Sequence, residues 1–141
     1  MGTPRRAAIT DHAGRNLTVL ALSVVLTILL LLETVPSAVA ALFRARPGLA
    51  RLDQLTRLST LQGQNLRVVS ILGAAHSAAA IALIAGLAVP AAGVAGAAIE
   101  MSVFGWVLSR QLRAGDRGRA LGAYLLFTTM ALAVLIVDAI R

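Results

Sequence analysis

The chain has 141 residues, of which 58% are hydrophobic, and a formal net charge of +7. Its mean hydropathy of +0.84 argues against a water-soluble domain, which would expose much of this apolar surface at such a length. We therefore expect one integral membrane domain in contact with the lipid bilayer. The sequence has no cysteine, which excludes disulfides and thiolate metal sites. All 13 basic residues are arginine, and we expect them to face anionic lipid headgroups rather than nucleic acid.

The first predicted span covers residues 17–43 and follows a basic N-terminal arm over residues 1–16. An apolar run of this length can cross a hydrocarbon core about 30 Å thick. Pro36 removes one backbone hydrogen bond within the run, which predicts a kink. The start also resembles a secretory signal peptide, with "SAVAA" as the cleavage site. A membrane span is preferred because the run is long and contains Glu33.

An arginine-rich connection follows at residues 44–67. Leucine recurs every third residue from Leu49 to Leu58, and Pro47 is suited to the first turn of a helix. We predict an amphipathic helix at the membrane interface, with arginines toward the headgroups and leucines toward the acyl chains. The alternative is an ordinary polar loop.

Three further apolar spans are predicted at residues 68–89, 91–112 and 120–140. Short connections make neighbouring helices antiparallel. The predicted fold is therefore all-α: an up-down four-helix transmembrane bundle over residues 17–141, with the amphipathic segment between its first two helices. Nine of the 13 arginines lie in the connections 44–67 and 110–119, which predicts that both connections are cytoplasmic.

Three of the predicted spans each carry one ionisable residue at a similar depth. With a rise of about 1.5 Å per residue, Glu33, His76 and Glu100 lie roughly 12–18 Å from the arginine-rich side. A charge at this depth is costly, so such residues face the bundle interior and pair with one another. We predict an acid–base cluster in which Glu100 is the protonated acid, Glu33 stays ionised and His76 orients or accepts the proton. The alternative is a structural hydrogen bond between helices.

Helical spacing places further polar and aromatic residues near this cluster. The predicted substrate pocket contains Asn65, Phe104, Trp106, Tyr124 and Thr128. The alternative for Trp106 and Tyr124 is an aromatic belt at the membrane interface. We expect Asp138 to be a solvated helix end. One histidine and two carboxylates are a thin ligand set for a metal, and we expect neither a metal nor another cofactor.

The segment "LGAAHSAAAIALIAGLAVPAAGVAGAAIEMSVFGWVLSRQLRAGDRGRALGAYLLF" resembles the DoxX-like family of small membrane proteins. It shares a glycine-containing second span, a short proline-containing turn and a third span that ends in an "LRAGD"-like loop. The resemblance covers residues 68–130 and implies a four-span fold in the bacterial inner (cytoplasmic) membrane. Family members often carry a glutamate on the second span, about where this chain has His76. The chain therefore departs from the family pattern at a residue of the predicted acid–base cluster.

Two functions follow from these observations. The buried cluster favours a membrane enzyme that acts on a lipophilic small-molecule substrate by epoxide opening, cyclisation or isomerisation. The resemblance implies instead a non-catalytic subunit or assembly factor of a quinone-linked oxidoreductase, partnered by a homo-oligomer or a larger membrane complex. A proton or solute carrier is least favoured, because the sequence has no evident inverted repeat.

Overall fold

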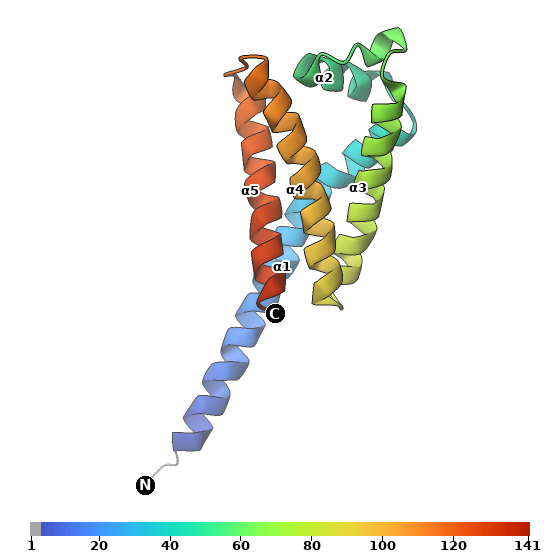
Figure 1. Cartoon of the computed structure of the whole chain (residues 1–141). Coiled ribbons are helices and arrows are strands. Elements are labelled where there is room, and N and C mark those ends of the chain that lie inside the picture. Colours follow the sequence, from blue (N-terminus) through green and yellow to red (C-terminus); the bar gives the residue numbers. More distant parts are fainter. Residues whose placement is uncertain (1–3) are drawn as a thin grey trace.

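The computed structural model describes the backbone of residues 4–141 and the side chains of residue 14 and residues 16–141. This part of the chain is helical and contains no strand (Figure 1). The elements are α1 (Pro4–Leu42), α2 (Arg46–Thr56), the 3-10 turn η1 (Thr60–Gln62), α3 (Leu66–Gly86), α4 (Pro90–Arg113) and α5 (Arg119–Ala139). The predicted all-α fold is confirmed, including a short helix between the first two long ones.

Four helical segments are long and apolar enough to cross a membrane: Asn16–Leu42 within α1, and the whole of α3, α4 and α5. They contain 21 to 27 residues, which corresponds to about 32–40 Å of helix and exceeds a hydrocarbon core of about 30 Å. The predicted spans differ from these bounds by three residues at most. The chain is a multi-pass membrane protein.

The long helices run up and down in chain order. Figure 1 shows α3, α4 and α5 side by side, with α1 behind them and in contact with α3 and α5. The first turns of α1 extend beyond the ends of the other helices, on the side where the chain ends (Figure 1). Pro36 lies inside α1, and the helix continues through it.

Small residues allow α3 and α4 to touch along their backbones. A Cβ atom added at Gly86 would collide with the backbone of Gly93, and one added at Gly96 would lie 2.8 Å from the backbone nitrogen of Leu83. Because lipid supplies no hydrophobic force between helices, such close approach is a main source of helix association in membranes. The tight α3–α4 hairpin therefore fixes which side chains of these two helices face each other.

The leucines of α2 do not face lipid as predicted. Leu49 and Leu55 of the helix are buried, as is Leu58 two residues after its end, and α2 lies across one end of the bundle in contact with α1 and α4 (Figure 1). Leu55 packs in the same apolar core as Phe104 and Val107 of α4. The amphipathic pattern correctly indicates a helix, but the apolar surface that buries its leucines is the end of the bundle rather than the acyl chains. We call this end the α2 end.

Asp53 holds the chain that follows α2 in a fixed turn. Its carboxylate accepts hydrogen bonds from the Thr60 backbone N–H (2.6 Å), the Thr60 hydroxyl (2.8 Å) and the Leu61 backbone N–H (2.9 Å). Partial burial opposes ionisation of this carboxyl, but the three hydrogen bonds outweigh it and hold the pKa of Asp53 below its ordinary value. The ionised carboxylate thus stabilises the return of the chain from α2 toward α3.

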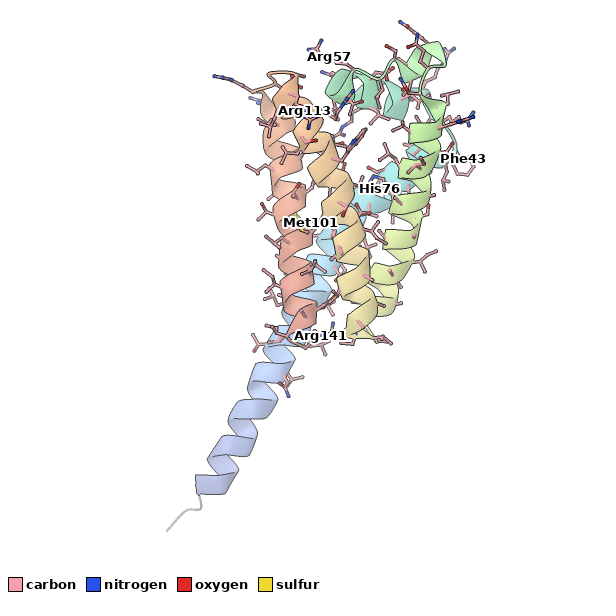
Figure 2. All side chains as sticks on the ribbon, in the orientation of Figure 1. Phe43, Arg57, His76, Met101, Arg113 and Arg141 are labelled. Atoms are coloured by element: carbon pink, nitrogen blue, oxygen red, sulfur yellow. The ribbon has the colours of Figure 1, made fainter. Side chains whose placement is uncertain are left out.

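Asp138, at the opposite end of the bundle, is not the solvated helix end that was predicted. It is 2% exposed and accepts hydrogen bonds from the hydroxyl of Ser23 (2.6 Å) and from Arg141 (3.1 Å), which is labelled in Figure 2. Arg141 also donates to the backbone carbonyl of Leu87 (3.1 Å). Gly93 makes room for this carboxylate, because an added Cβ would collide with it. The network ties α1 and α5 to the α3–α4 turn.

Candidate functional site

His76 of α3, labelled in Figure 2, meets Glu100 of α4 inside the bundle. Nδ1 of His76 lies 3.0 Å from each carboxylate oxygen of Glu100. His76 is 7% exposed and Glu100 is completely buried. With Glu100 ionised, its carboxylate can only accept, so Nδ1 carries the proton and Nε2 is left for another group.

A cavity of about 280 Å³ lies beside His76 and is lined by residues of all five α-helices. Most of its wall is apolar and includes Leu49, Leu52, Val69, Leu72, Val103 and Val107. Its polar lining residues are Glu33, Ser37, Arg51, His76 and Tyr124. An apolar hollow with a few convergent polar groups is the usual form of a small-molecule binding site.

The structure brings the three predicted acid–base residues together in an order that the sequence does not indicate. His76 and Glu33 both line the cavity, from α3 and α1. Glu100 does not line it and lies behind His76, in contact with Nδ1. The expectation that Glu100 would act directly as the acid therefore does not fit its position. Among the described residues, these three do not form a group able to hold a metal ion.

Two of the five predicted pocket residues, Phe104 and Tyr124, line the cavity. The ring of Phe104 lies 5.6 Å from that of His76 and 6.1 Å from that of Tyr124, measured between centroids. Tyr124 in turn packs edge-on against Phe127 at 5.9 Å. This aromatic group packs against one side of the His76 ring, which restricts how the imidazole can turn.

The other three predicted pocket residues lie outside the cavity wall. Asn65 precedes α3, and its amide donates to the backbone carbonyl of Leu58 (2.8 Å). The hydroxyl of Thr128 donates to the backbone carbonyl of Tyr124 (2.7 Å), one turn earlier in its own helix. Trp106 is half-buried and packs against the apolar core. Helical spacing gives their height along the bundle but not the side of the helix that faces the cavity.

The contribution of α2 to the site was not predicted from the sequence. Pro47, Gly48, Arg51 and Leu52 line the cavity at the α2 end, and Arg51 shares this cavity with Glu33 and Tyr124 of the long helices. The spacing of these four residues puts them on one helical face, which is the signal that could have identified them. In the sequence, Arg51 is simply one of several arginines in the connection between the first two spans.

Comparisons with protein-family models, with curated proteins and with solved structures find no match for this chain. The resemblance to the DoxX-like family stays a prediction. The geometry of the site is therefore the basis for assigning a function.

Proposed function

We propose that this protein is a membrane enzyme that acts on a lipophilic small molecule by general acid–base catalysis. The observation that carries the proposal is the placement of His76, whose Nδ1 contacts the buried carboxylate of Glu100 while its side chain lines the cavity. A carboxylate on one ring nitrogen fixes the tautomer and orientation of the imidazole. The other nitrogen is then free to exchange a proton with a bound substrate.

In this proposal His76 is the base and Glu33 the acid, because both line the same cavity. Glu100 is a positioning residue that stabilises the imidazolium formed when His76 takes up a proton. This assignment exchanges the roles that the sequence suggested for the two glutamates. A protonated carboxyl surrounded by apolar wall is a competent general acid.

Three reactions use this pair without any change of oxidation state. In isomerisation, His76 removes a proton beside a double bond while Glu33 protonates its far end. In epoxide opening, Glu33 protonates the epoxide oxygen as the C–O bond breaks, and His76 takes the proton of the attacking water. In cyclisation, the hydroxyl that attacks belongs to the substrate itself.

Isotope incorporation tests the proposal even while the substrate is unidentified. The purified protein in lipid nanodiscs is incubated with a lipid extract of the membranes it was isolated from, in D2O or in H2¹⁸O, and products are read by mass spectrometry. Carbon-bound deuterium indicates isomerisation, and ¹⁸O indicates hydrolysis of an epoxide. A product with a new retention time but neither isotope indicates cyclisation by an internal hydroxyl.

The control variants use neighbouring residues. His76→Gln and Glu33→Gln should abolish the product, whereas Ser77→Ala should leave it unchanged, since Ser77 bonds only to its own helix at Gly73. Lipid products that are the same with wild type and with His76→Gln would rule out the enzyme.

A second candidate function is favoured by α1, whose first turns extend beyond the rest of the bundle (Figure 1). Leu17 and Leu20 on this helix are 68% and 40% exposed and could contact another membrane subunit. The protein would then be a non-catalytic subunit, for which the DoxX-like resemblance suggests a quinone-linked oxidoreductase. Isolation from native membranes in mild detergent tests this, because a stoichiometric oxidoreductase partner would support it.

A further inference from the structure

We propose that the ligand of this cavity is a single-chain amphiphile with an anionic head group, a carboxylate or a phosphate, and that Arg51 binds this head. The inference rests on the proposed function, because it names the substrate class of the same site. In this inference α2 selects the substrate, and residues of the membrane-spanning helices convert it.

The first observation is the position of Arg51. It lies on α2 and lines the cavity together with Glu33 and Tyr124. The ion pairs in the described part of the chain are His76–Glu100 and Arg141–Asp138, so Arg51 belongs to neither. A guanidinium offers a planar set of donors that matches a carboxylate or phosphate. The cavity therefore has a cation at its α2 end that can accept an anionic head.

The second observation is that α2 is held in place. Arg110 of α4 donates to the backbone carbonyl of Thr56 at 3.1 Å, and Leu55 is buried in the bundle core. A Cβ atom added at Gly48 would lie 2.6 Å from the Cβ of Ala40, so α2 rests directly on α1. The backbone that carries Arg51 is thus positioned before a ligand arrives, which lowers the entropic cost of binding.

The third observation is the apolar part of the wall that Arg51 and His76 share, to which Leu52, Val69 and Leu72 contribute. An alkyl chain can make van der Waals contacts with this wall. A polar metabolite would instead lose its hydrogen bonds to water there and form none in return. A neutral lipid would contact the same wall, but only an anionic head would add a charge-assisted hydrogen bond to Arg51, whose side chain is exposed.

The charge balance of the site agrees with this assignment. An anionic head near an ionised Glu33 would be repelled, but the acid role proposed for Glu33 requires the protonated, neutral form. Arg51, whose side chain is exposed, is then the cavity-lining charge that has no ion pair among the described residues, since the imidazole of His76 contacts Glu100. One anionic head neutralises it.

Binding to matched probes tests the proposal. The protein is reconstituted in nanodiscs of zwitterionic phosphatidylcholine, and oleate, oleoyl lysophosphatidate and oleyl alcohol are titrated by calorimetry. The three probes share one chain and differ in the head. We expect at least one anionic probe to bind about tenfold or more tightly than the alcohol, which is the usual worth of a charged hydrogen bond. The tighter of the two anions tells whether the head is a carboxylate or a phosphate.

Variants of two arginines on α2 locate the effect. Arg51→Gln should remove the preference for the anionic probe and leave the binding of oleyl alcohol within about twofold, and Arg51→Lys should keep part of the preference. Arg46→Gln removes the same charge from an exposed residue outside the cavity wall and should keep the preference. Equal binding of all three probes by the wild type, or equal loss in Arg46→Gln and Arg51→Gln, would overturn the proposal.

The same titration with His76→Gln separates this inference from the catalytic one. If that variant keeps the anion preference and the wild type turns over no lipid, Arg51 binds an anionic amphiphile although the enzyme hypothesis fails. If the wild type converts a neutral lipid and binds all three probes alike, the enzyme stands and the anionic head is refuted. The comparison of probes on the wild type needs no variant, so a poorly folding substitution does not leave the question open.

Discussion

Replacing Glu100 with leucine should destabilise the bundle by about 1–3 kcal/mol, the cost of a buried donor left without an acceptor. Glu100 is 0% exposed and both of its carboxylate oxygens contact Nδ1 of His76, itself in a side chain that is 7% exposed. Leucine is somewhat larger than glutamate and leaves no cavity, so the lost hydrogen bond, together with some crowding, sets the magnitude. The variant leaves the imidazole N–H facing hydrocarbon.

The double variant His76→Leu/Glu100→Leu should recover most of this loss, because both polar groups are then replaced by apolar ones. The four proteins of this cycle are unfolded in mixed micelles of mild detergent and sodium dodecyl sulfate, and the free energies of unfolding are compared. Ser102→Ala, on an exposed position of α4, is the control and should change stability by less than about 0.5 kcal/mol. The pairing would be refuted if a single variant were as stable as the wild type. It would also be refuted if the stability lost in the double variant equalled the sum of the losses in the two single variants.

Glu100→Gln separates the positioning role from stability. The amide oxygen of glutamine can still accept from Nδ1, so the fold should survive. The negative charge that stabilises the imidazolium is gone, so kcat should fall by roughly 10²–10⁴ with little change in KM. Near-normal turnover in a folded Glu100→Gln protein would show that the pair is structural only.

Three further predictions concern the fold. Gly86→Ala places a methyl group against the α4 backbone and should lower the free energy of unfolding in mixed micelles by about 1–3 kcal/mol. Its control, Gly105→Ala, adds a methyl group in open space and should be neutral or slightly stabilising. Equal losses of stability in the two variants would contradict the close α3–α4 contact. An impermeant thiol reagent applied to whole cells should label Val89→Cys but not Gln64→Cys, and the reverse pattern would invert the predicted topology. Because the folded-state pKa of Asp53 is lowered, its stabilisation of the η1 turn is present above its ordinary pKa and is lost as the pH falls through the lowered value. Amide-exchange protection of that turn should therefore fall in acid in the wild type and be low at every pH in Asp53→Ala, and unchanged protection in acid would contradict this.

The sequence alone determined the membrane spans and the depth of the ionisable residues. Backbone polar groups in hydrocarbon must be satisfied within the segment, so a long apolar run has one stable form, the helix, and its bounds can be read from hydropathy. A fixed rise per residue then gives the height of each side chain. For this reason His76 and Glu100 were correctly expected to meet, and Glu33 lines the same cavity as His76.

Tertiary structure decided which neighbour each of these residues meets. The helical period gives the direction of a side chain relative to its own helix, but the rotation of that helix against the others depends on contacts such as that between Gly86 and Gly93. Those contacts place Glu100 behind His76 rather than on the cavity wall. The same kind of packing buries Asp138 at the opposite end, where the sequence shows only a helix terminus.

The position of Arg51 also came from the tertiary structure. The leucine pattern of α2 demands an apolar surface, and two such surfaces are present in a membrane protein: the acyl chains and the exposed end of the bundle. Sequence cannot choose between them, because both bury the same leucines. Packing on the bundle buries Leu55 in the core. Arg51 is four residues before Leu55, which is about 6 Å along the helix axis at a rise of about 1.5 Å per residue. The packing that buries Leu55 therefore also brings Arg51 to the cavity wall.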